Sequence, residues 1–170
     1  VKATSDVDMI REETMSIAQT SNESHQEMCI YDNKGSKNTF RVLVVDDDIV
    51  TRELIKKYLW ADGYELEFAE DGVDAHGKII KKKFDLILLD VLMHNLSGFQ
   101  LMELLREESE DTPVIFVSAK TSTDDEIKGL KLGAVDFIKK PIHKELLHLR
   151  VRNVLEMNKE LLHLKVRNVM

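Results

Sequence analysis

Polar side chains follow several short apolar runs of the sequence. Asp46 and Asp47 follow RVLVV, Asp90 follows FDLILL, Ser118 follows PVIFV, and Lys140 follows VDFIK. Parallel strands joined by crossover helices point their carboxyl ends to one edge of a sheet, where ligands bind, so these side chains are expected to converge. Three carboxylates that could hold a divalent cation, one hydroxyl and one ammonium group indicate a phosphorylatable carboxylate site.

The elements that would position these residues alternate regularly from Phe40 onward. The pattern predicts five strands, at 41–45, 64–69, 84–89, 113–117 and 135–139. It predicts helices near 50–61, 72–82, 98–108 and 123–132, with a last helix that begins after Pro141 and continues to Met170. The runs 86–89 and 114–117 are continuously apolar, as is typical of strands covered by helices on both faces. We therefore expect an α/β fold with an open, doubly wound parallel sheet.

Composition limits the class of protein. A chain of 170 residues with 43% hydrophobic and 32% charged residues can bury one core and carry appended segments. It has neither a signal-peptide start nor an apolar stretch of the roughly 20 residues that span a bilayer, so a cytoplasmic protein without membrane contact is expected. The net charge of −7 argues against direct nucleic-acid binding. Cys29 is the only cysteine and is interpreted as a reduced, incidental thiol.

The chain divides into three predicted parts. Residues 1–38 are polar and are interpreted as a tether or appended segment, with a short amphipathic helix indicated around Met9 to Ile17. Residues 39–155 form the predicted domain, and 156–170 a helical extension. The chain starts at Val1 without an initiator methionine, from which we expect a fragment of a larger protein or a trimmed product.

An internal repeat lengthens the last helix. KELLHLRVRNVL at 144–155 recurs as KELLHLKVRNVM at 159–170. One interpretation is a duplication that only extended a solvent-exposed helix. The other, which we favour, is packing on a partner helix, as in a homodimer, through a stripe formed by Val151, Leu155, Leu162 and Val169.

Residues 40 to about 155 resemble the receiver domain of two-component response regulators, the chemotaxis-regulator-like fold. The motifs that carry the resemblance are VLVVDDD, LLDVLMHNLSG, VIFVSAK and FIKKP. The resemblance implies the flavodoxin-like strand order 2-1-3-4-5 and a switch that takes a phosphoryl group from a sensor histidine kinase or a histidine phosphotransfer protein. Such a switch is not a metabolic enzyme; it catalyses only its own phosphoryl transfer and slow dephosphorylation. Dimerisation through the face of the fourth helix, fifth strand and last helix is also implied.

The resemblance assigns roles residue by residue. Asp90 is similar to the phosphoacceptor, Asp47 to a direct Mg²⁺ ligand, and Asp46 to a ligand of the ion's water. The backbone carbonyl of Leu92 would complete the protein ligands. Crowded carboxylates repel one another and need a compensating cation, and Mg²⁺ suits an all-oxygen site.

Three further roles follow from the same resemblance. Lys140 would neutralise charge on the transferring oxygens, Ser118 would close onto a phosphoryl oxygen, and Phe137 is similar to the aromatic residue that turns inward after that movement. Each has a plainer alternative. Lys140 could be a solvated lysine before Pro141, Ser118 a turn residue, and Phe137 a core aromatic. The sequence Lys140-Pro141 also favours a cis peptide.

The acids and the following loop leave alternatives open too. Asp46 and Asp47 could cap the helix that begins near Val50, although we assign that role to Asp48. His94 stands where the family usually has proline, and is interpreted as an exposed loop residue, with a role as ligand or base as the alternative. Leu92 and Lys120 occupy positions that tune hydrolysis of the acyl phosphate in the family.

Competing functions use the same residues differently. DDDIV fits the nucleophile motif of haloacid-dehalogenase-like phosphatases, with Asp46 attacking, but the acidic pair beyond the lysine is lacking. A flavodoxin-like flavin site is disfavoured because an aspartate triplet would repel the flavin phosphate. A dimerising scaffold that is not phosphorylated is the remaining alternative.

Overall fold

The computed structural model describes residues 30–31, 37–119 and 122–167. The chain divides into two compact units, Val1–Thr39 with Ala61–Gly63 and Phe40–Trp60 with Tyr64–Met170. In the first unit β1 (Ile30–Tyr31) pairs antiparallel with β2 (Lys37–Asn38). The sequence predicted only a polar tether here, and these short strands were missed. The amphipathic helix predicted around Met9 to Ile17 lies outside the described residues.

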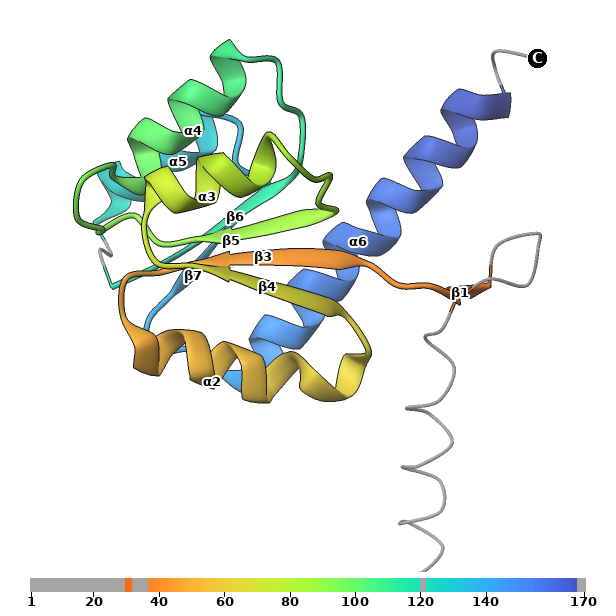
Figure 1. The fold of residues 1–170 in the computed structure, drawn as a ribbon, viewed down its shortest axis with the longest axis horizontal. Coiled ribbons are helices and arrows are strands. Elements are labelled where there is room, and N and C mark those ends of the chain that lie inside the picture. Colours follow the sequence, from red (N-terminus) through yellow and green to blue (C-terminus); the bar gives the residue numbers. More distant parts are fainter. Residues whose placement is uncertain (1–29, 32–36, 120–121, 168–170) are drawn as a thin grey trace, which may run out of the picture. The chain divides into compact units, whose positions relative to one another are not determined.

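The second unit is built on a five-stranded parallel sheet (Figure 1). The strands lie in the order β4-β3-β5-β6-β7, which is 2-1-3-4-5 when they are counted within this unit. Their bounds are Arg41–Val45 for β3, Glu65–Ala69 for β4, Leu86–Leu89 for β5, Val114–Ser118 for β6 and Asp136–Lys139 for β7. The predicted fold class and strand order are confirmed.

Five α-helices connect or follow these strands: α2 (Ile49–Leu59), α3 (Gly72–Ile79), α4 (Gly98–Glu107), α5 (Thr123–Lys131) and α6 (Lys144–Arg167). A short 3-10 helix, η1 (Trp60–Asp62), follows α2. Four of the helices begin after a side chain that accepts a hydrogen bond from a backbone N–H of the first turn, namely Asp48, Asp71, Ser97 and Ser122. Helix α5 ends before Gly133, whose φ of +92° favours glycine.

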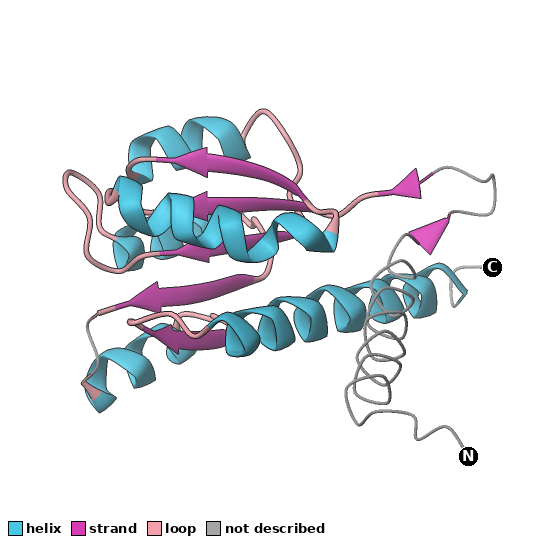
Figure 2. Ribbon diagram, turned by 90° about the horizontal axis from the view of Figure 1, so that it is seen from below, coloured by secondary structure: helices cyan, strands magenta, loops and turns pink. Residues whose placement is uncertain are grey.

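Helices lie on both faces of the sheet (Figure 2), and an apolar core fills the space on each face. Residues alternate along β3, so that Val42 and Val44 enter the core with α2 and α6, whereas Leu43 and Val45 enter the core with α3 and α4. Helix α5 lies on this second face, where Gly129 approaches the rings of the core. The sheet is thus covered on both faces, and its carboxyl edge is left for the site.

Helix α6 runs without interruption from Lys144 to Arg167. Leu147, Val151 and Leu155 are buried in the core with α2. The predicted partner stripe was therefore wrong in part, because Val151 and Leu155 already contact their own domain, while Leu162 is exposed. Val169 lies outside the described residues. None of the helices in the described part of the chain is long and apolar enough to cross a membrane.

Candidate phosphoacceptor and cation site

The ends of the four strands β3, β5, β6 and β7 meet at one edge of the sheet. Backbone hydrogen bonds fix this register: the N–H of Asp90 donates to the carbonyl of Val45, and the N–H of Lys140 donates to the carbonyl of Ser118, both at 2.9 Å. The polar residues that follow β3, β5 and β7, and the residue that ends β6, are therefore neighbours in space. The sequence prediction that they converge is confirmed by the strand order.

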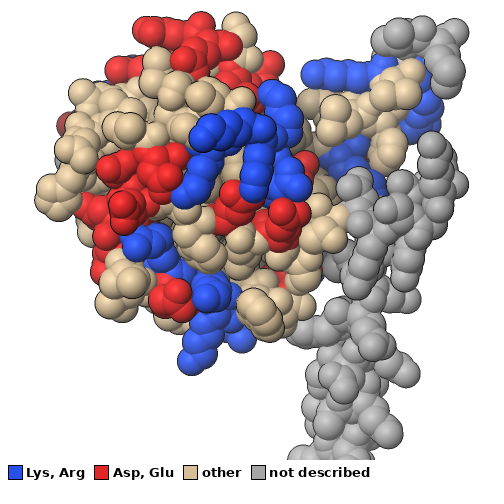
Figure 3. All heavy atoms as spheres, viewed as in Figure 1, with Lys and Arg blue, Asp and Glu red and all other residues tan. Residues whose placement is uncertain are grey.

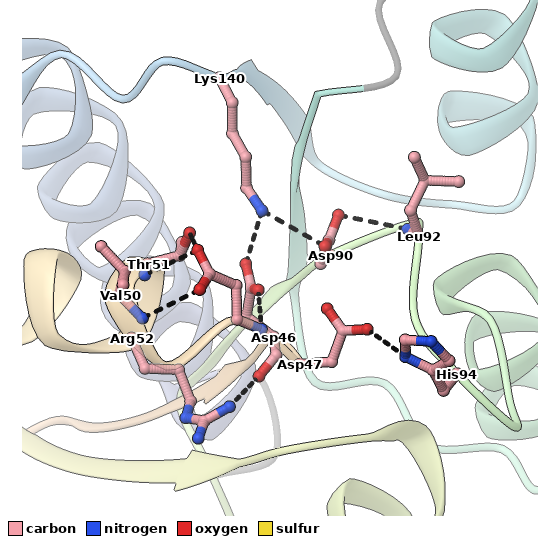
Figure 4. A network of polar contacts seen from close by, with 10 residues as sticks. Asp46, Asp47, Val50, Thr51, Arg52, Asp90, Leu92, His94 and Lys140 are labelled. Atoms are coloured by element: carbon pink, nitrogen blue, oxygen red, sulfur yellow. Dashed lines mark hydrogen bonds and ion pairs between the residues drawn. The ribbon is translucent and has the colours of Figure 1, made fainter.

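Three carboxylates form the centre of this edge (Figure 4). Each of Asp46, Asp47 and Asp90 offers an oxygen within 4.8 Å of the others. Asp46 is 1% exposed and Asp90 is 4% exposed. The Nζ atom of Lys140 lies 2.7 Å from Oδ2 of Asp46 and 3.3 Å from Oδ2 of Asp90, so one ammonium group bridges the two buried acids.

Backbone amides hold the other oxygen of each buried acid. The N–H of Asp48 donates to Oδ1 of Asp46 at 2.9 Å, and the N–H of Leu92 donates to Oδ1 of Asp90 at 3.2 Å. Each carboxylate is therefore oriented from two sides, by an amide and by Lys140. This fixes their rotamers before any ligand arrives.

The electrostatics of the site oppose ionisation of Asp90. Burial raises the pKa of Asp90, and the charge of Asp46 raises it further, although Lys140 and the N–H of Leu92 work in the other direction. Burial alone would lower the pKa of Lys140. The hydrogen bond to Asp46 and the charges of Asp90 and Asp46 outweigh that burial, so the pKa of Lys140 is raised.

The donor set fits a hard divalent cation. Three carboxylates beside one ammonium group, which contacts only Asp46 and Asp90, leave a negative excess at the sheet edge, which a divalent ion would compensate. All of the grouped donor atoms are oxygens, as Mg²⁺ and Ca²⁺ prefer. The cluster could therefore bind a metal ion.

Asp48 performs the capping role that the sequence assigned to it. Its carboxylate accepts the N–H groups of Val50 and Thr51, each at 3.1 Å. The hydrogen bond from the Thr51 hydroxyl, followed by that from the N–H of Val50, lowers the pKa of Asp48. The helix α2 start is thus satisfied without Asp46 or Asp47, which remain available to the site.

His94 makes a contact that the sequence did not predict. Its Nδ1 atom lies 2.7 Å from Oδ2 of Asp47, while its side chain is 90% exposed. The interpretation of His94 as an exposed loop residue is confirmed, but the contact with an acid of the site was missed. The available signal was its place in the loop after β5, beside the edge where the acids gather.

Ser118 and Phe137 are buried, like Asp46 and Asp90. Ser118 is fully buried as the last residue of β6, so it is part of a strand and not of a turn. The ring of Phe137 lies 5.9 Å from that of Phe116, which packs edge-on against Phe99 at 5.2 Å. Phe137 is thus a core aromatic in this structure, and its role in switching stays a prediction.

A close approach of α4 supports the loop after β5. The N–H of Gly98 donates to the carbonyl of Val91 at 3.0 Å, and a Cβ at position 98 would overlap the carbonyl oxygen of Asp90. Ser97 and Gln100 form a reciprocal capping box at the same helix start. Only glycine permits this contact between the helix and the loop that carries Asp90.

Three further residues that the sequence analysis named follow strands of the sheet along the chain. The Lys140-Pro141 peptide is cis, as the sequence indicated. Lys120, which was singled out for acyl phosphate hydrolysis, lies outside the described residues. The side chain of Leu92 is exposed, and its role in tuning hydrolysis of the acyl phosphate stays a prediction.

Comparison with known proteins identifies this arrangement. The family model described as the response regulator receiver domain matches residues 42–152. The chain belongs to the response regulator receiver family. The match includes Asp46, Asp47, Asp90, Ser118 and Lys140, so the residues that meet at the sheet edge all fall inside the receiver.

Curated relatives and solved structures of receivers agree with this assignment. The transcriptional regulatory protein PcoR of Escherichia coli is 38% identical over 115 residues, which cover 68% of this chain and 51% of PcoR. The response regulator MprA of Mycobacterium sp. (strain KMS) is also 38% identical over 115 residues, covering 68% of this chain and 50% of MprA. The chain thus spans about half of the length of these relatives.

Among solved structures, the receiver domain of the Francisella response regulator 1452 is 35% identical with a TM-score of 0.67, covering 70% of this chain and 98% of that one. The Vibrio cholerae chemotaxis protein CheY4 is 34% identical with a TM-score of 0.64, covering 68% of this chain and 98% of CheY4. Both likenesses support the family assignment and the predicted chemotaxis-regulator-like fold.

Proposed function

We propose that this receiver accepts a phosphoryl group on Asp90 from a histidine kinase or a histidine phosphotransfer protein. The observation that carries the proposal is the pair of buried acids bridged by one lysine, with Lys140 2.7 Å from Asp46 and 3.3 Å from Asp90. A buried carboxylate with an ammonium group beside it is suited to receive an anionic group, because the ammonium charge offsets the charge that arrives.

The transfer requires an in-line attack by a carboxylate oxygen of Asp90 on phosphorus. A phosphorus–oxygen bond forms, the phosphorus–nitrogen bond to the donor imidazole breaks, and the bond's electron pair leaves with the imidazole. Lys140 stabilises the negative oxygens on the transferring group, while the N–H of Leu92 holds the carboxylate in place. The product is an acyl phosphate on Asp90.

Mg²⁺ is the proposed cofactor. Asp47 and Asp90 would bind the ion directly, Asp46 through a water molecule, and the backbone carbonyl of Leu92 would complete the protein ligands. When bound, the ion would supply positive charge to the transferring oxygens. The support is the all-oxygen donor set of the three acids and their shared edge of the sheet.

The switch that follows phosphorylation is proposed to involve Ser118 and Phe137. Ser118 ends β6 next to β7, and Phe137 lies on β7 against Phe116. Gly129 of α5 would bring a Cβ within 3.0 Å of the Phe116 ring, so α5 packs closely on this aromatic pair. A movement of the Ser118 hydroxyl would therefore be transmitted to the face formed by α5, β7 and α6.

The proposed partner of this site is a phosphoryl donor and not nucleic acid. Acidic and basic side chains are mixed on the face shown in Figure 3, without a broad basic surface there. The name of PcoR assigns transcriptional regulation to that protein. For the residues of this chain we keep the prediction that they make no direct contact with nucleic acid.

Intact mass after incubation with acetyl phosphate and Mg²⁺ tests the proposal. We expect the wild type to gain one phosphoryl mass and Asp90→Asn to gain none. Asp48→Asn is the matched control, because Asp48 lies in the same edge but caps α2, and asparagine retains that cap. It should be phosphorylated like the wild type.

The other outcomes separate the alternatives. An adduct that persists in Asp90→Asn and is lost in Asp46→Asn would contradict the proposal and favour a phosphatase nucleophile at Asp46. The absence of any adduct in the wild type, from acetyl phosphate and from a phosphorylated histidine donor alike, would favour the dimerising scaffold.

A further inference from the structure

The part of α6 beyond the domain presents an apolar surface. Leu155 is the last residue of the helix that is buried. Among the described residues that follow it, five apolar side chains are exposed: Met157, Leu161, Leu162, Leu164 and Val166. Their side chains range from 51% to 70% exposed. Figure 3 shows basic side chains beside uncharged surface at this end of the helix.

Part of this surface has the spacing of a coiled-coil seam. Val154, Met157, Leu161 and Leu164 are separated by three, four and three residues. Val154 is half-buried and also packs against the core with α2, whereas the other three are exposed. At 3.6 residues per turn all four positions lie within roughly 80° of arc on one side of the helix. Leu162 and Val166 lie more than roughly 100° around the helix from the centre of that seam.

The internal repeat explains how the seam arose. The second copy begins 15 residues after the first, which is four turns plus roughly 60° of rotation. Leu147 and Val151, which are buried in the domain, recur as Leu162 and Val166, which fall outside the seam. The partly exposed Leu146 and Leu149 recur as Leu161 and Leu164, and these two supply the seam's centre.

We propose that residues 154–167 pair in parallel with the same residues of a second copy of this chain, as a two-stranded coiled coil. Residues at equivalent positions then meet across the seam, so each of its four layers is apolar. An antiparallel pair that sets Met157 against Leu161 of the partner subunit would also be apolar in each layer, but it would bring Glu160 near Glu160 of the partner subunit.

Charges beside the seam favour the same partner. Glu160 precedes Leu161, and Lys165 follows Leu164. In a parallel pair these positions lie opposite each other, so Glu160 approaches Lys165 of the partner subunit, and the two-fold axis repeats the contact. The surface is thus self-complementary in both shape and charge, which identifies a second copy as its occupant.

Sedimentation velocity over a range of protein concentrations tests the pairing on the full chain without phosphoryl donor. Leu161→Asn with Leu164→Asn should raise the dimer dissociation constant by at least about tenfold, because both substitutions remove apolar burial from the seam. Leu162→Asn with Val166→Asn is the matched control and should associate like the wild type. All four side chains are exposed in the monomer, so thermal unfolding should show intact domains.

Charge reversal tests the orientation. Glu160→Lys should weaken the dimer, and adding Lys165→Glu should restore it. Restoration by Arg167→Glu instead would indicate antiparallel pairing and overturn the proposal. A wild type that stays monomeric at every concentration, or equal weakening by the control pair, would also overturn it. Because no phosphorylation is needed, these outcomes are independent of the proposed transfer to Asp90.

Discussion

At the scale of single residues, burial disfavours the charge of both members of the site's ion pair, but only for Lys140 do the neighbouring groups outweigh it. Asp90 is penalised as an anion, whereas Lys140 remains charged because two carboxylates face its ammonium group. The site therefore stores an unfavourable charge on Asp90 that a cation or a phosphoryl transfer can relieve. The buried charge on Asp90 lowers the free energy of unfolding, as is common for groups kept for function.

Replacement of Asp90 should reveal this cost. Its pKa is raised in the folded state above the ordinary value of an aspartate, so the folded state binds the proton more tightly. The associated stability is fully present below the unfolded pKa and is lost as the pH rises through the folded pKa. Asp90→Asn cannot ionise. We expect its free energy of unfolding, without divalent cations, to exceed that of the wild type at pH 7 by on the order of 1 kcal/mol.

Urea unfolding with a chelator, followed by circular dichroism, measures this difference. The gain should disappear when the pH falls below the unfolded pKa of Asp90, because both proteins are then neutral at position 90. A gain that stayed constant down to that pH would contradict the burial argument and indicate a packing effect of asparagine.

At the scale of elements, most of the fold could be predicted from the alternation of apolar runs with helical segments. The bounds of β3 agree with the predicted 41–45, and Asp48 caps α2 as assigned. These features depend on local periodicity and on local hydrogen bonds. The last helix was also predicted, but the residues that it buries were not. Tertiary packing decides how far α6 lies against the domain, and its last buried residue is Leu155.

The candidate site shows the same division. The meeting of Asp46, Asp90 and Lys140 followed from strand ends alone, since parallel topology fixes which ends are neighbours. The contact of His94 with Asp47 did not follow, because it depends on the path of the loop after β5 and on a side-chain rotamer. The short strands β1 and β2 were missed because each is only two residues long, too short to show an alternation of apolar and polar residues.

A glycine substitution at the start of α4 tests how this helix positions the loop that carries Asp90. Gly98→Ala would force a Cβ into the carbonyl of Asp90, which is backbone and cannot turn aside. We expect a loss of about 1–3 kcal/mol in the free energy of unfolding and slower phosphorylation. Gly77→Ala is the matched control in helix α3, where no atom lies within 4 Å of the added Cβ. It should stabilise by about 0.5–1 kcal/mol.

Chemical denaturation with parallel measurement of acetyl phosphate incorporation would separate the two. Equal effects of both alanines on phosphorylation would contradict the view that close contact between α4 and the loop after β5 positions Asp90. A Gly98→Ala protein that is less stable but accepts phosphate at the wild-type rate would limit the role of this glycine to folding.

At the scale of the whole molecule, cation binding and folding are linked. A ligand that binds only the folded state adds RT ln(1 + [L]/Kd) to its stability, about 2.7 kcal/mol at a hundredfold excess over Kd. Since the three carboxylates converge only in the folded chain, Mg²⁺ should raise the unfolding temperature of the receiver, and the rise should grow with the logarithm of its concentration.

The pattern of that stabilisation distinguishes a specific site from general screening of the net charge of −7. Asp47→Asn removes one proposed ligand at a partly exposed position and should abolish most of the rise. Asp48→Asn removes an equal charge two residues along the chain from Asp46, keeps the cap of α2 and should retain the rise. If KCl of matched ionic strength stabilised the wild type as much as MgCl₂, or if both variants lost the effect equally, the cluster would be acting as a diffuse acidic surface. Selective loss in Asp47→Asn would instead mean that a cation bound at Asp47 offsets the repulsion among the three carboxylates.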